Sequence, residues 1–354
     1  MSITLQQGGG LTPQAAAFAA SLQQGHGERP IALGNYPAVD TVHANEYLRN
    51  FVLGYKRPEG QFIADLVIPP LPVVNETDNY YIWDRSPGSR REQTLVPDRA
   101  AAREIRPTFS SDSYRAERYA LATSISDRER RNSDDQLGLE QAQILMVEQV
   151  LRLDTEVRAA ELLTKANTSG VTLSGTEQWN NASYDGTDAT DGIEARFDVG
   201  KTAVRTATNG REATHVIIPD AVAKIIKRDP TVRELIKYTQ QDLLVNGDLP
   251  PVLWNLKVVI PKAMYTTTPE GTAEASVTYS DIWGGTDVRI IHVNPTPAMM
   301  VPATAYQFRL TADNYSVDEW REDRRKLDLY ELSVTQDMKL TMSGGCYVIE
   351  DAIA

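Results

Sequence analysis

The sequence predicts a mixed α+β fold, and three stretches carry that prediction. Residues 133–165 have the pattern of one long helix, residues 193–315 alternate between helix and strand patterns, and residues 316–354 read as strands. Before the long helix, a polar, arginine-rich stretch at 86–107 (SPGSRREQTLVPDRAAAREIRP) separates two strand-like runs. A loop of this length is typically either disordered or there to contact something else.

The first part of the chain, residues 1–55, does not have the pattern of a folded domain. Three glycines at 8–10, an alanine-rich helical stretch at 12–24 and the segment GHGERP make an arm with short helical pieces. Such an arm needs another surface to bury against. The core begins within residues 56–74, where QFIADLVIPPLPVV is apolar and broken by prolines.

Residues 75–120 are predicted to form an extended loop, a β-hairpin. From Thr77 to Arg118 a two-stranded ribbon could reach up to about 60 Å, whereas a compact body of this chain length has a radius of gyration of roughly 20 Å. Because an isolated ribbon is marginal in water, we expect the hairpin to lie across another copy of the protein. It would present a positive strip to that copy, made of Arg85, Arg90, Arg91, Arg99, Arg103 and Arg106.

Residues 133–165 give the strongest single element, a helix of roughly 45–50 Å. Ser133 or Asp134 can cap its N-terminus. Acid-first pairs four residues apart, such as Glu148 with Arg152, support the helix. Apolar residues at three- and four-residue spacing predict one continuous core stripe: Leu139, Ala142, Met146, Val150, Leu153, Val157 and Ala160.

A turn-rich span at 167–192 separates this helix from an α/β module at 193–315. The module begins with a helix, followed by the buried strand pattern of ATHVIIP and further alternation of helices and strands. Strand patterns return in 316–354. The charged segment DEWREDRR at 318–325 is either a solvated strand end or a contact between subunits.

The composition is that of a globular protein with a formal net charge of −12, which argues against gripping duplex DNA. The single cysteine, Cys346, excludes an intramolecular disulfide and favours a reducing compartment. No run is apolar enough for a membrane span, and the N-terminus lacks the pattern of a signal peptide, so we expect no membrane contact. We therefore expect a protein that is made and kept inside a cell, or that leaves it only by lysis.

No motif indicates an enzyme, and we expect no catalytic residue, no metal and no cofactor. VGKT at 199–202 lacks the first glycine of a phosphate-binding loop, because Ala195 stands in its place. NNASYDGTDATDG at 180–192 resembles a calcium loop, but Gly192 stands where a bidentate glutamate is required. The histidines have no ligand spacing: His26, His43, His215 and His292.

Taken in order, these segments resemble a known family. FIADLVIPPLPV and NYYIWDR precede the loop, and RAERYALATSISDRERRNSD leads into LRLDTEVRAAELL of the long helix. RDPTVRELIKYTQ lies in the α/β module, and VTQDMKLTMSGGCYVIEDAI closes the chain. This ordered set is similar to the major capsid proteins of tailed bacteriophages, which have the Hong Kong 97-type fold. The resemblance covers roughly residues 50–354, and no single motif in it is diagnostic.

The resemblance implies a virion protein, assembled in the host cytoplasm. It would form pentamers and hexamers of an icosahedral shell that encloses double-stranded DNA without sequence-specific binding. A scaffolding protein, a portal and a decoration protein are the further partners it implies. The implied parts are an N-terminal arm at 1–55, a peripheral domain with a spine helix at 56–74, 121–192 and 316–354, an extended loop at 75–120, and an axial domain at 193–315.

Some members of this family cross-link their shell covalently, by an isopeptide bond between a loop lysine and an asparagine of a neighbouring subunit. Between Lys56 and Lys165 this chain has no lysine, so we expect a shell held together non-covalently. Three alternatives stay open: an encapsulin-type compartment that encloses an enzyme, a phage tail tube or sheath protein, and a soluble α/β enzyme with a large lid.

Overall fold

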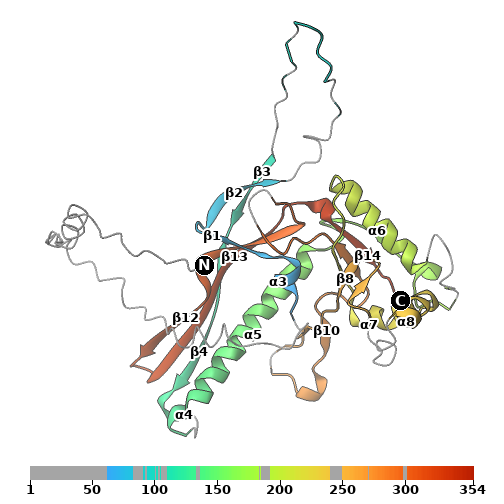
Figure 1. The fold of residues 1–354 in the computed structure, drawn as a ribbon. Coiled ribbons are helices and arrows are strands. Elements are labelled where there is room, and N and C mark those ends of the chain that lie inside the picture. The colour runs from blue at the N-terminus through green and yellow to red at the C-terminus, as the bar shows by residue number, and fades with distance from the viewer. Residues whose placement is uncertain are drawn as a thin grey trace, which may run out of the picture. The chain divides into compact units, whose positions relative to one another are not determined.

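Two β-sheets and one long helix, α5 (Gln136–Leu162), dominate the computed structural model of this chain (Figure 1). The mixture of helices and sheets confirms the predicted α+β class. The predicted arm and part of the predicted loop lie outside the residues that the structure describes. Those residues are 62–82, 91, 94–99, 101–102, 104, 110–132, 136–182, 184, 192–239, 249–269, 271–297 and 301–354.

One sheet has four strands in the order β1-β12-β13-β4. The long strands β12 (Ala305–Glu322) and β13 (Leu327–Leu340) are antiparallel neighbours. β4 (Glu117–Ser126) pairs antiparallel with β13 at one edge, and β1 (Pro70–Val73) pairs parallel with β12 at the other. β12, β13 and β4 run beside α5 in Figure 1, and α5 contacts β4 and β13 alike.

The first half of α5 packs on one face of this sheet. Successive side chains of a strand point to opposite faces, so Tyr330, Leu332 and Val334 of β13 all face the helix. Ile144 and Leu151 of α5 meet them in one apolar cluster. This packing fixes the direction of the helix along the sheet.

The other sheet has six strands in the order β5-β14-β11-β6-β8-β7. Its central strands β11 and β6 are short and buried along their whole length, as expected when both faces of a sheet are covered. The strands are β5 (Ser169–Thr172), β14 (Cys346–Glu350), β11 (Val288–Ile291), β6 (His215–Ile217), β8 (Leu256–Val259) and β7 (Val252–Leu253).

Helices cover the two faces of the six-stranded sheet. On one face, α6 (Ile193–Ala207), α7 (Asp220–Ile226) and α8 (Pro230–Thr239) contribute to one apolar core. On the other face, α3 (Ala64–Val67) and the end of α5 pack around the fully buried Trp283. The long helix therefore contacts both sheets, one with each of its halves.

Shorter elements complete the fold. Ser126 and Glu129 make a reciprocal cap at the start of α4, because each backbone N–H donates to the other side chain, at 2.9 and 3.2 Å. The shorter elements are β2 (Thr77–Ile82) paired with β3 (Ser110–Arg115), β9 (Met264–Thr266) paired with β10 (Tyr279–Asp281), α4 (Asp127–Asn132), and 3-10 turns at Gly175–Glu177, Glu274–Ser276 and Ser343–Gly345.

The strand pairing departs from the expected division of the chain. The expected boundary at 315 falls inside β12, and β5 and β14, which were assigned to the peripheral part, pair within the six-stranded sheet. The expected loop ends at 120, but β4 already pairs with β13 from Glu117 onward. The reason is that membership of a sheet follows hydrogen-bonded partners rather than order along the chain.

The long helix is confirmed, but three of the seven residues in its predicted core stripe do not face the core. Ala142, Met146 and Val150 are exposed, Met146 by 66% and Val150 by 44%, so their assignment to the core is wrong for the single chain. Of the other members, Leu139, Leu153 and Val157 are half-buried and Ala160 is buried. The face that does pack inside is formed by Ile144, Glu148, Leu151, Thr155 and Ala159.

Candidate assembly surfaces

The β2–β3 hairpin is anchored at its root on the four-stranded sheet. The ring of Tyr114 stacks on Phe308 of β12 with centroids 4.4 Å apart, and Tyr80 lies against the same ring at 5.2 Å. Burial, together with the neighbouring Asp112, raises the pKa of Tyr80 well above its usual value. The paired strands β2 and β3 therefore have a fixed base on the sheet.

The predicted positive strip lies beyond this root. Arg91 and Arg99 are exposed, and Arg85, Arg90, Arg103 and Arg106 lie outside the described residues. The sequence reasoning missed two apolar neighbours, Leu95 and Val96, whose side chains are 81% and 42% exposed. The signal for them was the short apolar pair within an otherwise polar segment, QTLVPDR.

A second exposed apolar surface lies on the side of α5 that is next to β4. Gln143 accepts a hydrogen bond from Thr123 of β4 at 2.8 Å, and the Arg158 guanidinium lies 3.7 Å from the ring centroid of Tyr119. Between these two contacts Leu121 of β4 is 40% exposed. We call Leu121, Met146 and Val150 the β4-side surface.

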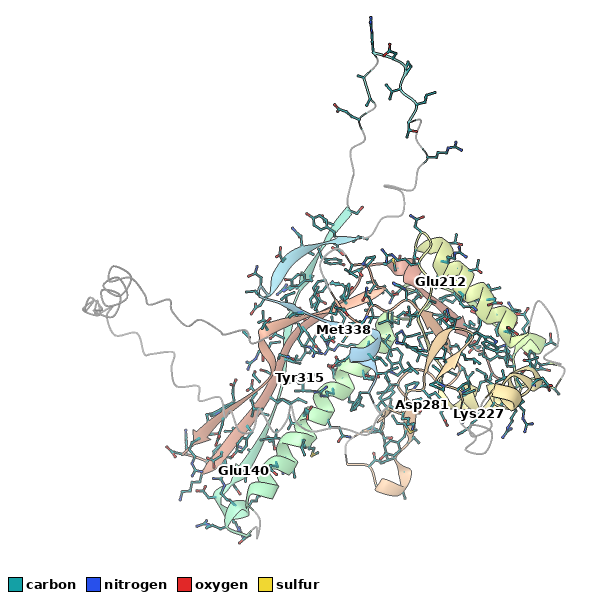
Figure 2. The ribbon with its side chains drawn as sticks, in the orientation of Figure 1. Glu140, Glu212, Lys227, Asp281, Tyr315 and Met338 are labelled. Carbon is teal, nitrogen blue, oxygen red and sulfur yellow. The ribbon has the colours of Figure 1, made fainter. Side chains whose placement is uncertain are left out.

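The middle of α5 carries a partly buried polar cluster rather than an apolar one. Arg152 donates to Glu148 at 2.6 Å, and Arg309 of β12 donates to Asp65 at 2.7 Å. Both guanidinium groups lie over the ring of Tyr315, at 4.5 and 5.3 Å from its centroid. Tyr315, labelled in Figure 2, is 2% exposed, so the cluster links α5, β12 and α3 around a buried ring, with Asp65 of α3 at its exposed edge.

One carboxylate near the end of α5 binds the start of α3 and the segment between β10 and β11. Glu156 accepts the backbone N–H groups of Ile63 and Ala64, both at 2.8 Å, and the indole N–H of Trp283 at 2.6 Å. Burial raises the pKa of Glu156, and the three donors oppose that shift. Arg289 completes the joint by donating to the Leu163 carbonyl at 3.0 Å.

Charged residues form a network where β12 turns into β13. Arg321 donates to both oxygens of Asp127, at 2.7 and 2.8 Å, and these hydrogen bonds lower the pKa of Asp127. Asp328 is shared between Arg321 and Arg130, at 2.9 and 2.7 Å. Much of the charge of DEWREDRR is therefore paired within this strand end, while Trp320 is 42% exposed.

Where the structure describes them, the motifs and residues that resemble ligand-binding or reactive sites in the sequence serve the packing of the fold instead. VGKT lies inside α6, where a Cβ added to Gly200 would come within 2.5 Å of Ile290, so the glycine permits close packing of helix on sheet. Burial, with Lys257 and His292 nearby, lowers the pKa of His215 to about 4. Burial likewise raises the pKa of the Cys346 thiol to about 12. Most of the calcium-loop-like segment lies outside the described residues.

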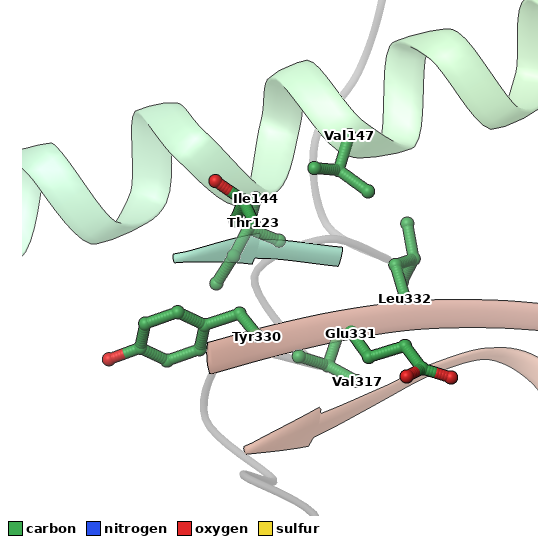
Figure 3. Close-up of a pocket in the computed structure, with 7 residues that line it drawn as sticks. All are labelled: Thr123, Ile144, Val147, Val317, Tyr330, Glu331 and Leu332. Atoms are coloured by element: carbon green, nitrogen blue, oxygen red, sulfur yellow. The ribbon is translucent and has the colours of Figure 1, made fainter. Parts of the chain in front are cut away.

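No ligand site emerges from the described parts of the chain. In those ranges no group of three or more His, Cys, Asp or Glu side chains could hold a metal ion. None of the helices there is long and apolar enough to cross a membrane. Figure 3 shows a gap between α5 and the four-stranded sheet that has no room for a water molecule, lined by Thr123, Ile144, Val147, Val317, Tyr330, Glu331 and Leu332.

Comparison with known proteins identifies relatives of the sequence and of the fold. The major capsid protein of Pseudomonas phage JBD67 is 26% identical over 157 residues, which are 42% of this chain and 51% of that protein. The match therefore spans about half the length of that curated relative. A phage-related protein of Bordetella bronchiseptica RB50 is 20% identical with a TM-score of 0.65, covering 88% of this chain and 98% of that one.

A second solved structure is an assembled capsid. The capsid protein of cyanophage P-SCSP1u is 10% identical with a TM-score of 0.58, covering 84% of this chain and 90% of that one. The shared architecture is the Hong Kong 97-type fold of phage capsids. The family model described as phage capsid protein matches residues 110–321, from β3 to β12. Because this match covers more than half of the sequence, the chain belongs to the phage capsid protein family.

Proposed function

We propose that this chain is the major head protein of a tailed phage. Copies of it would assemble, as pentamers and hexamers, into the icosahedral shell that encloses the phage's double-stranded DNA. Membership of the phage capsid protein family supports this proposal, as do surfaces that the chain's own core leaves uncovered. The net charge of −12 suits a wall that encloses DNA without gripping it.

One observation carries the proposal: the β2–β3 hairpin is anchored at its root, yet beyond that root it exposes apolar side chains. Tyr80 and Tyr114 fix the root on Phe308, while Leu95 and Val96 are exposed. Exposed apolar side chains gain stability when another surface covers them. In a shell that surface is a neighbouring copy of the same chain.

The arginines of the loop would add a charged component to this contact. The whole chain carries 48 acidic and 36 basic side chains, so the surface that a neighbour offers is acidic on average. An exposed ion pair contributes only about 0–1 kcal/mol. Repeated in every subunit and joined to other contacts, such small contributions make a stable shell.

We infer no catalytic role for this chain. The thiol of Cys346 and the imidazole of His215 are buried, and their shifted pKa values hold both of them neutral near pH 7. A scaffolding protein, a portal and a decoration protein are the partners we propose for the shell, in the virion and during its assembly in the host cytoplasm.

Electron microscopy of the full chain expressed alone tests the proposal, with light scattering on the same sample. Closed shells are the expected result. Tubes would contradict it and point to a tail protein, and capture of a tagged enzyme peptide would point to an encapsulin-type compartment. Dispersed monomer, also after co-expression with the neighbouring phage genes, would overturn it.

A charge reversal separates the loop contact from folding. We expect the double substitution Arg91→Glu with Arg99→Glu to abolish or strongly reduce shells while circular dichroism stays that of the parent chain. Arg233→Glu, at an exposed position of α8, is the matched control and should leave assembly intact. Equal assembly of all variants would exclude the loop arginines from the contact.

A further inference from the structure

The outer edge of β4 is an unprotected strand edge. The N–H of Asp127 donates to the Lys326 carbonyl at 3.1 Å, so odd-numbered residues of β4 point their backbone groups at β13. The even-numbered residues point theirs outward: the Ser126 N–H is taken by Glu129 at 2.9 Å. Within the described ranges, no backbone partner meets the outward groups of Arg118, Ala120, Ala122 and Ser124.

Soluble proteins usually protect such an edge with charges, prolines or bulges. From Tyr119 to Ser126 the sequence is YALATSIS, which contains neither a charge nor a proline. The pairing of β4 with β13 runs without a register shift from Glu117 to Ser126. A straight edge of ten residues, of which the eight from Tyr119 to Ser126 are uncharged, favours the addition of another strand.

The β4-side surface lies directly beside this edge. Thr123 contacts Gln143 and Tyr119 contacts Arg158, so Leu121 lies opposite the middle of that helix segment, near Val150. A strand added to β4 would bring its side chains over Leu121, Met146 and Val150. It would therefore cover the exposed apolar residues of α5 and the exposed residue of β4 together.

The edge is complementary to itself. In an antiparallel pair that sets Ala120 opposite the partner's Ala122, Leu121 meets the partner's Leu121 on the two-fold axis. Arg118 then lies opposite Ser124 and Glu117 opposite Ile125, so like charges do not meet. No other register keeps the exposed Leu121 at the centre.

Helix spacing agrees with this pairing. Strands lie about 4.8 Å apart. Each α5 contacts β4 and β13 alike. Two helices that each sit between those strands would be separated by about twice the strand spacing, or about 10 Å, across the joined sheets. That is the upper end of the 8–10 Å range in which helices pack on each other. Met146 and Val150 of the two copies would then fill the space between the helices.

We propose that two copies of this chain join edge to edge through β4, antiparallel across a two-fold axis at Leu121, with their α5 helices packed side by side. This inference rests on the proposed function, since it names one contact of the assembly. It also explains the exposed positions of the predicted stripe: Met146 and Val150 are core residues of the pair rather than of the single chain.

Disulfide trapping in the assembled full-length protein tests the register. The natural Cys346 is buried, so an introduced cysteine is the accessible thiol. Residues opposite each other in a non-hydrogen-bonded pair have Cα atoms about 4.5 Å apart, which a disulfide can span. We expect Leu121→Cys to give a reducible dimer on denaturing gels after mild oxidation.

Matched variants make the result specific. Thr123→Cys should not cross-link, because its partner copy lies four residues away along the strands, about 13 Å. Adding Tyr119→Cys to Thr123→Cys should restore the dimer, since those two positions face each other. Assembled particles without a Leu121→Cys dimer, or with equal cross-linking of both single variants, would overturn the β4 pairing and leave the proposed function intact. A chain that neither assembles nor cross-links would contradict both.

A proline scan gives a second readout. Ala122→Pro removes an outward N–H only, and edge strands tolerate proline there. We expect this variant to keep the circular dichroism of the parent chain and to lose the contact, so that particle yield falls severalfold. Unchanged yield would contradict the pairing, as would the same loss of yield in Ala122→Val, a matched control that keeps the outward N–H.

Discussion

At the scale of single residues, glycines show where backbone segments approach too closely for any side chain. Gly170 of β5 pairs with Val348 of β14, and a Cβ added there would lie 2.2 Å from the Val348 carbonyl oxygen. The atom it meets belongs to the backbone of a central strand, so it cannot move aside. Gly200 differs, because the atom it would meet is the flexible end of Ile290.

Gly170→Ala should therefore destabilise the six-stranded sheet. We expect the free energy of unfolding to fall by about 1–3 kcal/mol, the usual cost of overpacking. Gly285→Ala is the control, since a Cβ at that position meets nothing within 4 Å. Urea unfolding of both variants gives the comparison, and equal midpoints would show that β5 can shift away from β14 at little cost.

At the scale of elements, the sequence predicts the existence and extent of α5 well and its core-facing side poorly. Periodicity reveals apolar stripes, but it cannot tell which stripe meets the chain's own sheet. Here the inward face includes Glu148, Thr155 and Glu156, although polar side chains of this kind are normally expected to be exposed to solvent. Glu148 pairs with Arg152 four residues on, whereas partners far along the chain satisfy the other two, Trp283 for Glu156 and Gln336 for Thr155. No local sequence pattern predicts these distant hydrogen-bond partners.

Glu156 gives the test at this scale. Glu156→Gln keeps the size of the side chain but turns one acceptor oxygen into a donor, which would face the N–H of Ile63 or Ala64. Leaving a buried donor unsatisfied costs about 1–3 kcal/mol, so the free energy of unfolding should fall by that amount. Glu161→Gln, exposed on the same helix, should change little. Equal stability of the two variants, measured by urea unfolding, would mean that the hydrogen bonds of Glu156 to the start of α3 and to Trp283 do not stabilise the fold.

At the scale of the whole molecule, the order of elements along the chain was predictable and the strand pairing was not. The strand return after 316 was expected as one unit, yet β13 pairs with β4 while β14 pairs with β5 and β11 in the other sheet. Gly170 and Val348 become neighbours across about half of the chain's length, and hydrophobic alternation within a strand does not specify such a partner. The exposed apolar side chains beyond the hairpin root and on the β4-side surface can likewise be interpreted only when contacts between copies are considered.

The strength of the proposed shell then depends on how copies are joined, and the sequence bears on this directly. Between Lys56 and Lys165 there is no lysine, so residues 75–120 offer no amine for an isopeptide bond. Lys165 itself is engaged within its own chain, with its ammonium 3.0 Å from Glu350. We therefore expect mature particles, boiled in denaturing detergent under reducing conditions, to run as the single chain. Particles treated with glutaraldehyde provide the positive control and should give a ladder. A ladder in untreated particles would show that a lysine outside the loop forms the bond and would contradict a non-covalent shell.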